Sequence, residues 1–382
     1  MLSFFVIATL VLCSVHAYLF FKLRHLFSSP QGRLLLLIFL ILMLGLLLLR
    51  RREFYAALPD FVPWVAYTWL GFTLIALGCF LAYDSARLVF FLLKLVTGKE
   101  LLPFLAPKFF TPIMLIAALG ISGYAMYEAR HLKLKHINIA SPKQIGGMNK
   151  LRIVAVSDLH IGETIGSGDV DKWAAIIREQ KPDLLVVVGD IIDTDMSMRD
   201  EEARLLRSIP TTYGTYAVLG NHEVYSGLQN SRNFIRRAGM ILLENEADTS
   251  GPINIVGVND PQVARFGDGE QPDVPALLQG VDQKKFTLLL KHQPVFQDGE
   301  TGLFDLQISG HTHGGQIWPG RYLVRRIFGF KQGLTLMRQE KNNSLLYLMN
   351  GTGYWGPPMR FLARPEIIVF DISGVDRSGA SI

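Results

Sequence analysis

Charged residues and cysteines are scarce in this sequence. Only 19% of its 382 residues are charged and only two are cysteines, whereas soluble globular chains carry roughly a quarter charged residues. Two cysteines cannot build a disulfide scaffold, 35 glycines exclude a collagen-like repeat, and 49% hydrophobic residues exclude a disordered chain. No internal repeat is visible. The positive mean hydropathy of +0.27 therefore predicts a membrane protein with a folded domain attached.

The charge is divided unevenly between the two parts of the chain. Residues 1–150 contain 15 Lys and Arg against 5 Asp and Glu, a net charge of +10, and residues 151–382 contain 23 against 28, a net charge of −5. A basic, apolar part suits a membrane with anionic headgroups. An acidic part argues against a nucleic-acid surface, which is normally basic, and suits a domain that binds cations.

Four apolar runs without Asp, Glu, Lys or Arg occupy residues 2–21, 34–49, 62–83 and 109–127. About 20 apolar residues are needed to cross the hydrocarbon core as a helix. The run 34–49 is short, but Arg33 and Arg50–Arg52 flank it and their long side chains can reach the headgroups. We therefore predict an all-α transmembrane domain over residues 1–149 with about four spans.

Two features of the membrane part stay open. Asp84–Gly98 is apolar, but Arg87 and Lys94 fall on one helical face, so it is either an interfacial helix continuing from the third span or a fifth, short span. The positive-inside rule does not choose an orientation, because both possible sets of inner loops are basic. The membrane side of the second domain is therefore not predicted.

From Leu151 onward short apolar runs rich in β-branched residues alternate with helical stretches, a pattern typical of βαβ units around a parallel sheet. The later strands follow each other more closely and suggest a second, more antiparallel sheet. The predicted strands are residues 151–156, 184–188, 216–219, 253–258, 286–290, 306–308, 344–349 and 367–371.

Polar clusters follow five of these strands, and all five histidines of this part of the chain lie in them. In open α/β sheets ligands bind at the carboxyl ends of the strands, so the clusters should converge. Imidazole and carboxylate ligands without a thiolate suit Mn, Fe, Zn or Co rather than Ca or Mg; we favour manganese slightly. The clusters are Ser157-Asp158-Leu159-His160, Gly189-Asp190-Ile191-Ile192-Asp193, Gly220-Asn221-His222-Glu223, Lys291-His292-Gln293-Pro294 and Gly310-His311-Thr312-His313-Gly314-Gly315-Gln316.

This order of Asp-x-His, Gly-Asp-x-x-Asp, Gly-Asn-His-Glu, a lone His and Gly-His-x-His resembles the calcineurin-like metallophosphoesterase family over residues 150–372. The Gly-His-Thr-His-Gly-Gly-Gln motif and Arg360 with Pro365-Glu366-Ile367 resemble a bacterial subgroup that is often membrane-associated. Relatives in that subgroup include a pyrophosphatase acting on UDP-diacylglucosamine.

The resemblance implies two facing mixed sheets flanked by helices, and two divalent metal ions. His222 matches the family's catalytic histidine that is not a ligand, and Asp193 the carboxylate that orients it in some members. In protein phosphatases Arg-Gly follows this Asp, but no Arg-Gly follows Asp193 here, which argues against a phosphoprotein substrate. The implied ligands are Asp158, His160 and His313 for the first metal, Asn221, His292 and His311 for the second, and Asp190 bridging both.

Three residues near the end of the domain have two interpretations each. Arg360 either contacts substrate phosphate or forms a structural pair. Tyr354 and Trp355 either line an apolar substrate groove or pack in the core. They lie in or next to a Gly-x-Gly-x-x-Gly segment, which we interpret as a loop near the metal site, because Pro357-Pro358 cannot continue as a dinucleotide-binding helix.

The sequence thus predicts a transmembrane domain (1–149), a metallophosphoesterase domain (150–372) and a tail (373–382) in a multi-pass protein of a bacterial inner membrane. The predicted reaction is metal-dependent hydrolysis of a phosphate ester or pyrophosphate bond. The membrane anchor favours a lipid-linked substrate among membrane lipids and no nucleic-acid partner. The alternatives are a phosphodiesterase acting on a soluble nucleotide and a non-catalytic membrane receptor for phosphate ligands. The oligomeric state is not predicted.

Overall fold

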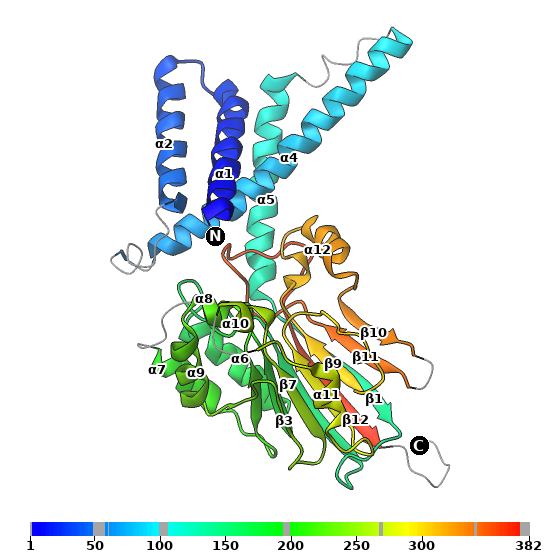
Figure 1. Ribbon diagram of the computed structural model, residues 1–382. Helices are drawn as coiled ribbons and strands as arrows, with labels where there is room; N and C mark the ends of the chain where they lie inside the picture. Colours follow the sequence, from blue (N-terminus) through cyan, green and yellow to red (C-terminus); the bar gives the residue numbers. More distant parts are fainter. Residues whose placement is uncertain are drawn as a thin grey trace. The chain divides into compact units, whose positions relative to one another are not determined.

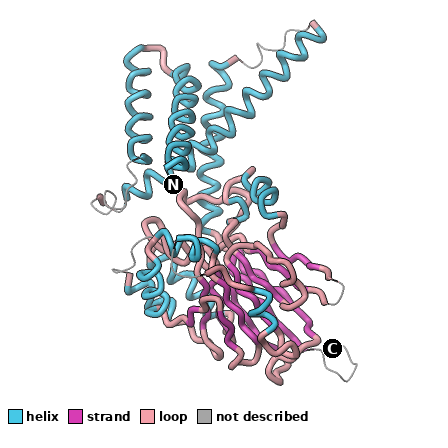
Figure 2. The backbone as a smooth tube through the Cα atoms, viewed as in Figure 1, coloured by secondary structure: helices cyan, strands magenta, loops and turns pink. Residues whose placement is uncertain are grey.

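The computed structural model describes residues 2–48, 58–59, 61–98, 106–193, 199–266, 270–339 and 342–374. The chain divides into two compact units (Figure 1). The first contains residues 1–127 and 356–359, and the second contains residues 128–355 and 360–382. In the described residues the first unit is helical, and the strands lie in the second (Figure 2).

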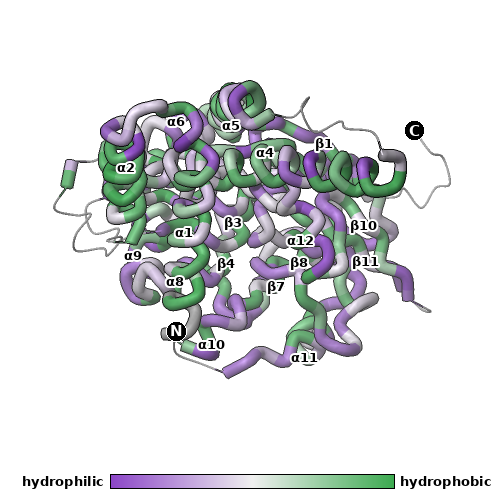
Figure 3. Tube along the Cα trace, turned by 90° about the horizontal axis from the view of Figure 1, so that it is seen from above, coloured by the Kyte–Doolittle hydropathy of each residue, from purple (hydrophilic) through white to green (hydrophobic). Residues whose placement is uncertain are grey.

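The first unit is built from long apolar helices: α1 (Leu2–Leu23), α2 (Pro30–Leu48), α4 (Phe61–Thr97) and α5 (Pro107–Arg130). In Figure 3 the tubes of α1 and α2 are mostly green, the colour of hydrophobic residues. Within the described residues four helices are long and apolar enough to cross a membrane, as predicted. Residues 84–97 continue α4 without a break, so they form no separate fifth helix.

The boundary between the domains differs from the predicted one. Residues 133–141 form strand β1 (Lys133–Ser141), which pairs in parallel with β12 (Glu366–Gly374) along its whole length. The second unit therefore begins at Glu128 and not at residue 150. Ile137 and Ile139 alternate with polar residues here, a weak strand signal that the sequence prediction left in the preceding domain.

The second unit contains two six-stranded mixed sheets, as the resemblance implied. The first has the order β1-β12-β2-β3-β4-β5 and the second β10-β11-β9-β8-β7-β6. In the second sheet only the pairs at the two edges are antiparallel, because β11, β9, β8 and β7 run parallel. The other bounds of the first sheet are β2 (Lys150–Val156), β3 (Leu184–Val188), β4 (Thr215–Val218) and β5 (Ile241–Leu242). Those of the second are β6 (Glu246–Asp248), β7 (Asn254–Val258), β8 (Thr287–Lys291), β9 (Leu306–Ser309), β10 (Gly333–Met337) and β11 (Ser344–Leu348).

Alternate residues of the central strands enter two different cores. Every residue of β3 is buried; Leu184, Val186 and Val188 join the cluster shared with the second sheet, whereas Leu185 and Val187 join the cluster shared with helices. This period of two is the geometry of a strand covered on both faces. The helices of this unit are α6 (Ser167–Glu179), α7 (Asp200–Arg207), α8 (Asn221–Tyr225), α9 (Leu228–Arg237), α10 (Pro261–Phe266), α11 (Val274–Gln279) and α12 (Gly320–Phe328), with a 3-10 turn η3 (His313–Gly315).

Candidate metal centre

The five polar clusters directly follow β2, β3, β4, β8 and β9, and their side chains converge. β2, β3 and β4 run parallel in one sheet, as β8 and β9 do in the other, so within each sheet the carboxyl ends lie at one edge. Positive φ angles, which are costly for residues other than glycine, occur at nine described non-glycine residues. Five of these are predicted metal ligands: Asp158, His160, Asp190, His311 and His313.

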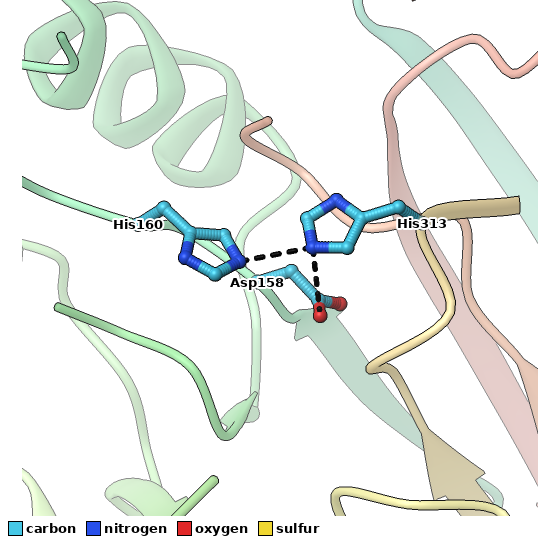
Figure 4. Close-up of side chains that lie close together, drawn as sticks. All are labelled: Asp158, His160 and His313. Carbon is cyan, nitrogen blue, oxygen red and sulfur yellow. Dashed lines mark hydrogen bonds and ion pairs between the residues drawn. The ribbon is translucent and has the colours of Figure 1, made fainter. Parts of the chain in front are cut away.

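The first group of donor atoms consists of Asp158, His160 and His313, all within 4.8 Å of one another (Figure 4). Nε2 of His160 lies 2.9 Å from Nε2 of His313, which is 3.5 Å from Oδ1 of Asp158. All three side chains are almost fully buried. These are the residues that the resemblance assigns to the first metal.

The second group consists of Asp190, His292 and His311. Nδ1 of His292 donates to the carbonyl oxygen of Val188 at 2.8 Å, so its Nε2 faces Oδ2 of Asp190 at 3.0 Å. The same Oδ2 is 3.9 Å from Nε2 of His160 in the first group. A single carboxylate oxygen therefore lies between the two groups, which is the position that a bridging ligand requires.

Asn221 is the seventh predicted ligand, and it begins α8 beside the second group. The next backbone N–H, that of His222, donates to Oδ1 of Asp190 at 2.9 Å. Within the described residues, Oδ1 of Asn221 and Nδ1 of His311 are buried without a hydrogen-bond partner. Such orphaned acceptors are rare in folded proteins, and both belong to the residues assigned to the second metal.

The protonation of the histidines also suits cation binding. Burial, together with the charge of Arg360, lowers the pKa of His313 well below its ordinary value, and burial with the charge of His292 lowers the pKa of His311 to about 4. Both rings are then neutral at pH 7 and keep a lone pair for a metal. Burial opposes protonation of His292, but the charge of Asp190 outweighs it and raises the pKa. Without a metal, a proton would thus take the cation's place beside Asp190. The residues fit a site for two divalent cations.

His222 belongs to neither of these two groups, but with His160 and Asp193 it forms a third group whose donor atoms lie within 4.8 Å of one another. Its Nδ1 is 2.6 Å from Oδ1 of Asp193, and the same oxygen is 2.7 Å from Nδ1 of His160. Burial opposes protonation of His222, but the charges of Asp190 and Asp193 and the hydrogen bond to Asp193 raise its pKa to about 9. A protonated imidazole whose Nδ1 is held by a carboxylate keeps Nε2 as a proton donor, which is the arrangement that an acid catalyst needs.

Arg360 makes its contacts within the protein interior. Its side chain is fully buried. Nη1 donates to the carbonyl oxygens of His313 and Asn350, both at 2.7 Å, and Nη2 donates to the carbonyl oxygen of Gly353 and lies 3.0 Å from Nδ1 of His313. These contacts fit the structural alternative, in which Arg360 positions His313, and the substrate-binding role stays a prediction.

Glu223 completes the site in a way that the sequence motif did not reveal. Its buried carboxylate accepts hydrogen bonds from four backbone N–H groups, which join the loop after β3 to the loop after β4. The bonds come from Gly220 at 2.6 Å, Asp190 at 3.0 Å, Ile191 at 2.7 Å and Ile192 at 3.2 Å. Gly220 leaves the space for this junction, because a side chain there would collide with Asp190.

Tyr354 and Trp355, whose roles the sequence left open, have different environments in the structure. Tyr354 is buried, and its hydroxyl donates to the carbonyl oxygen of Thr164 at 2.9 Å, so it packs in the core. Trp355 is 47% exposed with its ring 5.6 Å from that of His222. Gln316 holds the backbone of Trp355, donating to its carbonyl oxygen and accepting from its N–H. Only Trp355 remains available to a substrate.

The comparisons with known proteins agree with this geometry. The calcineurin-like phosphoesterase family matches residues 151–315, which contain the five clusters except for Gln316, the last residue of the fifth. An uncharacterized metallophosphoesterase of Aquifex aeolicus is 34% identical over 263 residues, 68% of this chain and 99% of that protein. One of Campylobacter jejuni is 33% identical over 269 residues, 68% of this chain and 69% of that protein. A protein of Danio rerio, named transmembrane protein with metallophosphoesterase domain, is 29% identical over 270 residues, 67% of this chain and 60% of that protein.

The family is one of metal-dependent phosphoester hydrolases, and the four apolar helices mark this member as a membrane protein. The ordered motifs, the two sheets and the two groups of donor atoms all agree with the family match. The chain belongs to the calcineurin-like phosphoesterase family.

Proposed function

We propose that this protein is a hydrolase anchored in the bacterial inner membrane that uses two divalent metals to cleave a phosphate ester or pyrophosphate bond of a lipid-linked substrate. The observation that carries the proposal is the position of Oδ2 of Asp190, which lies 3.0 Å from His292 of one donor group and 3.9 Å from His160 of the other. Manganese is our first choice of metal.

The chain's own residues supply the remaining chemistry. When bound, the two cations would neutralise charge on the phosphoryl oxygens and make water a better nucleophile at neutral pH. Asp193 holds Nδ1 of His222, so the opposite nitrogen, Nε2, is free to protonate the oxygen of the leaving group. The exposed rings of Tyr225 and Trp355 lie 5.4 and 5.6 Å from that of His222 and would contact the group that leaves.

Membrane attachment supports a lipid-linked phosphate. Four helices are long and apolar enough to span a bilayer, and the Danio rerio relative is also named as a transmembrane protein. Only residues 131 and 132 separate α5 from β1, so the chain between the last candidate span and the first strand of the phosphoesterase unit is short. Suitable substrates are an acylated sugar nucleotide, a phospholipid or a polyprenyl diphosphate.

The first experiment measures hydrolysis of bis-(p-nitrophenyl) phosphate by the full-length protein in detergent, with Mn²⁺ and after removal of metal by a chelator. Activity that depends on metal supports the hydrolase, whereas metal binding without turnover would favour a receptor for phosphate ligands. The second experiment incubates membrane lipid extracts with the wild type and with Asp190→Ala. A phosphorylated lipid consumed by the wild type alone supports the proposed substrate class. Turnover confined to soluble nucleotides would contradict it.

A further inference from the structure

The nine-residue helix α12 exposes an apolar face that a helix of a soluble domain would normally bury. None of its residues is buried, and Leu323 and Ile327, one helical turn apart, are each 64% exposed. At 100° per residue, Val324 and Phe328 fall on the same side. Arg325 and Arg326 fall on the opposite side, whereas Arg321 lies at nearly the same angle as Phe328.

This helix is attached firmly to the candidate metal centre. Three residues separate it from the Gly-His-Thr-His-Gly-Gly-Gln cluster. The ring of Phe328 lies 5.5 Å from that of His311, and Arg321 donates to the carbonyl oxygen of Leu362 at 2.6 Å. Gly315 packs so closely against Arg321 that it has no room for a side chain. A surface that binds α12 would therefore also orient the metal centre.

The chemistry of the exposed residues favours an anionic bilayer surface over a second protein. Arginines opposite an apolar face, with exposed aromatic residues such as Trp318 and Tyr322 nearby, are the composition of helices that lie in the headgroup region. A stable dimer needs about 800 Å² from each partner, much more than one face of a nine-residue helix offers.

The acidic charge of the rest of the unit means that an anionic membrane would attract α12 rather than the surface around it. Residues 151–382 carry a net charge of −5, so an anionic membrane would repel most of their surface and attract the arginines of α12. We propose that α12 is an interfacial helix: Leu323 and Ile327 insert among the lipids, Arg325 and Arg326 contact anionic headgroups, and the metal centre is thereby turned toward the membrane surface. This proposal does not depend on a lipid substrate, because it concerns how the protein itself binds lipid.

The test uses the full-length protein with Cys13→Ser and Cys79→Ser, reconstituted in nanodiscs of zwitterionic lipid or of lipid with an added anionic component. A polarity-sensitive fluorophore is attached at Leu323→Cys, at Ile327→Cys in a second protein, and at Glu201→Cys as the control. Glu201 lies on α7 and its side chain is 53% exposed. We expect blue-shifted emission at positions 323 and 327, several-fold stronger quenching by lipids brominated near the headgroup than at position 201, and a larger effect with anionic lipid.

Replacing Arg325 and Arg326 together by Glu should reduce the lipid quenching at position 323 in anionic nanodiscs while the label at position 201 is unchanged. The proposal would be overturned if iodide in the water quenches the fluorophores at both 323 and 327 as strongly as the one at 201. Protection from iodide without quenching by brominated lipid would also overturn it, because that result would indicate a protein partner.

Discussion

His222 and Asp193 are joined by a contact of 2.6 Å between Nδ1 and Oδ1. The same carboxylate oxygen lies 2.7 Å from Nδ1 of His160, and the two imidazole rings are perpendicular with centroids 4.7 Å apart. One acceptor therefore orients both a predicted metal ligand and the predicted acid. Because Nδ1 of each ring contacts Asp193, Nε2 is the nitrogen that remains for metal binding in His160 and for proton donation in His222.

His222→Ala should affect substrates according to their leaving groups. General acid catalysis contributes roughly 10²–10⁴-fold, but only where the departing oxygen needs a proton. A nitrophenolate leaves readily as an anion, whereas an alkoxide does not. We expect the variant to retain its metals and much of its activity on nitrophenyl esters, and to lose far more on alkyl phosphodiesters. Equal losses on both substrates at unchanged metal content would show that His222 acts by positioning or by its charge.

Asp190→Asn should remove metal from both groups of ligands. The amide lacks the negative charge that Oδ2 offers to His160 and His292 from its shared position. We expect elemental analysis to find a fall from about two metals per chain to one or none, with loss of hydrolysis. Asp200→Asn is the control, because the Asp200 side chain is 80% exposed. Full metal content together with full activity in Asp190→Asn would rule out a bridging role.

Glu223→Gln should weaken metal binding without removing a ligand. The carboxylate accepts four backbone N–H bonds, and an amide group would turn its own N–H donors toward some of them. Changes in residues that orient metal ligands typically reduce affinity or activity about 10–100-fold. Titration with Mn²⁺ measures this, with Glu201→Gln as the exposed control. An unchanged affinity would mean that the two loops keep their positions without the charge.

Asp371→Asn should lower stability at neutral pH only. Arg152 donates to both oxygens of Asp371, at 2.8 and 3.0 Å, and Lys150 lies 2.9 Å away. The hydrogen bonds from Arg152 hold the pKa of Asp371 below its ordinary value. An acid with a lowered pKa stabilises the folded state above the unfolded pKa of about 3.9, and this stabilisation is lost as the pH falls through the folded value.

We therefore expect Asp371→Asn to cost about 1–2 kcal/mol at pH 7, a modest loss because Arg152 and Lys150 are partly exposed to solvent. Thermal unfolding should show the difference from wild type shrinking as the pH falls below about 4. Asp200→Asn, whose exposed carboxylate pairs with Arg237, should change stability little at any pH. A deficit for Asp371→Asn that is the same at pH 3 and pH 7 would contradict this origin.

Two truncations should show whether the folded phosphoesterase domain begins at residue 128 or at residue 150. A chain starting at Glu128 keeps β1 and the bond from the Ala363 N–H to Glu128 at 2.9 Å. A chain starting at residue 150 leaves β12 as an unpaired edge, which promotes aggregation. Size-exclusion chromatography should show a monodisperse first protein and an aggregated second one. Two equally soluble proteins would mean that β1 is dispensable for folding.

The sequence alone was sufficient to predict the type of fold and the family. Parallel strands end at one edge of a sheet, so polar clusters after successive strands, such as those of Asp158, Asp190 and Asn221, must gather there. The long apolar runs predicted membrane helices for a similarly local reason, because length and composition decide whether a helix can span a bilayer. Both inferences depend on patterns that can be recognised within short segments of the chain.

The buried contacts of Arg360, the junction made by Glu223 and the pairing of β1 were decided only by the tertiary structure. Arg360 donates to the carbonyl oxygen of His313, 47 residues away, and β1 pairs with a strand near the other end of the described chain. Such contacts form between residues that no local pattern links. Burial also changes the chemistry: a guanidinium that could bind phosphate at the surface instead donates to backbone carbonyl oxygens in the interior, because a buried charge must find its partners within the protein.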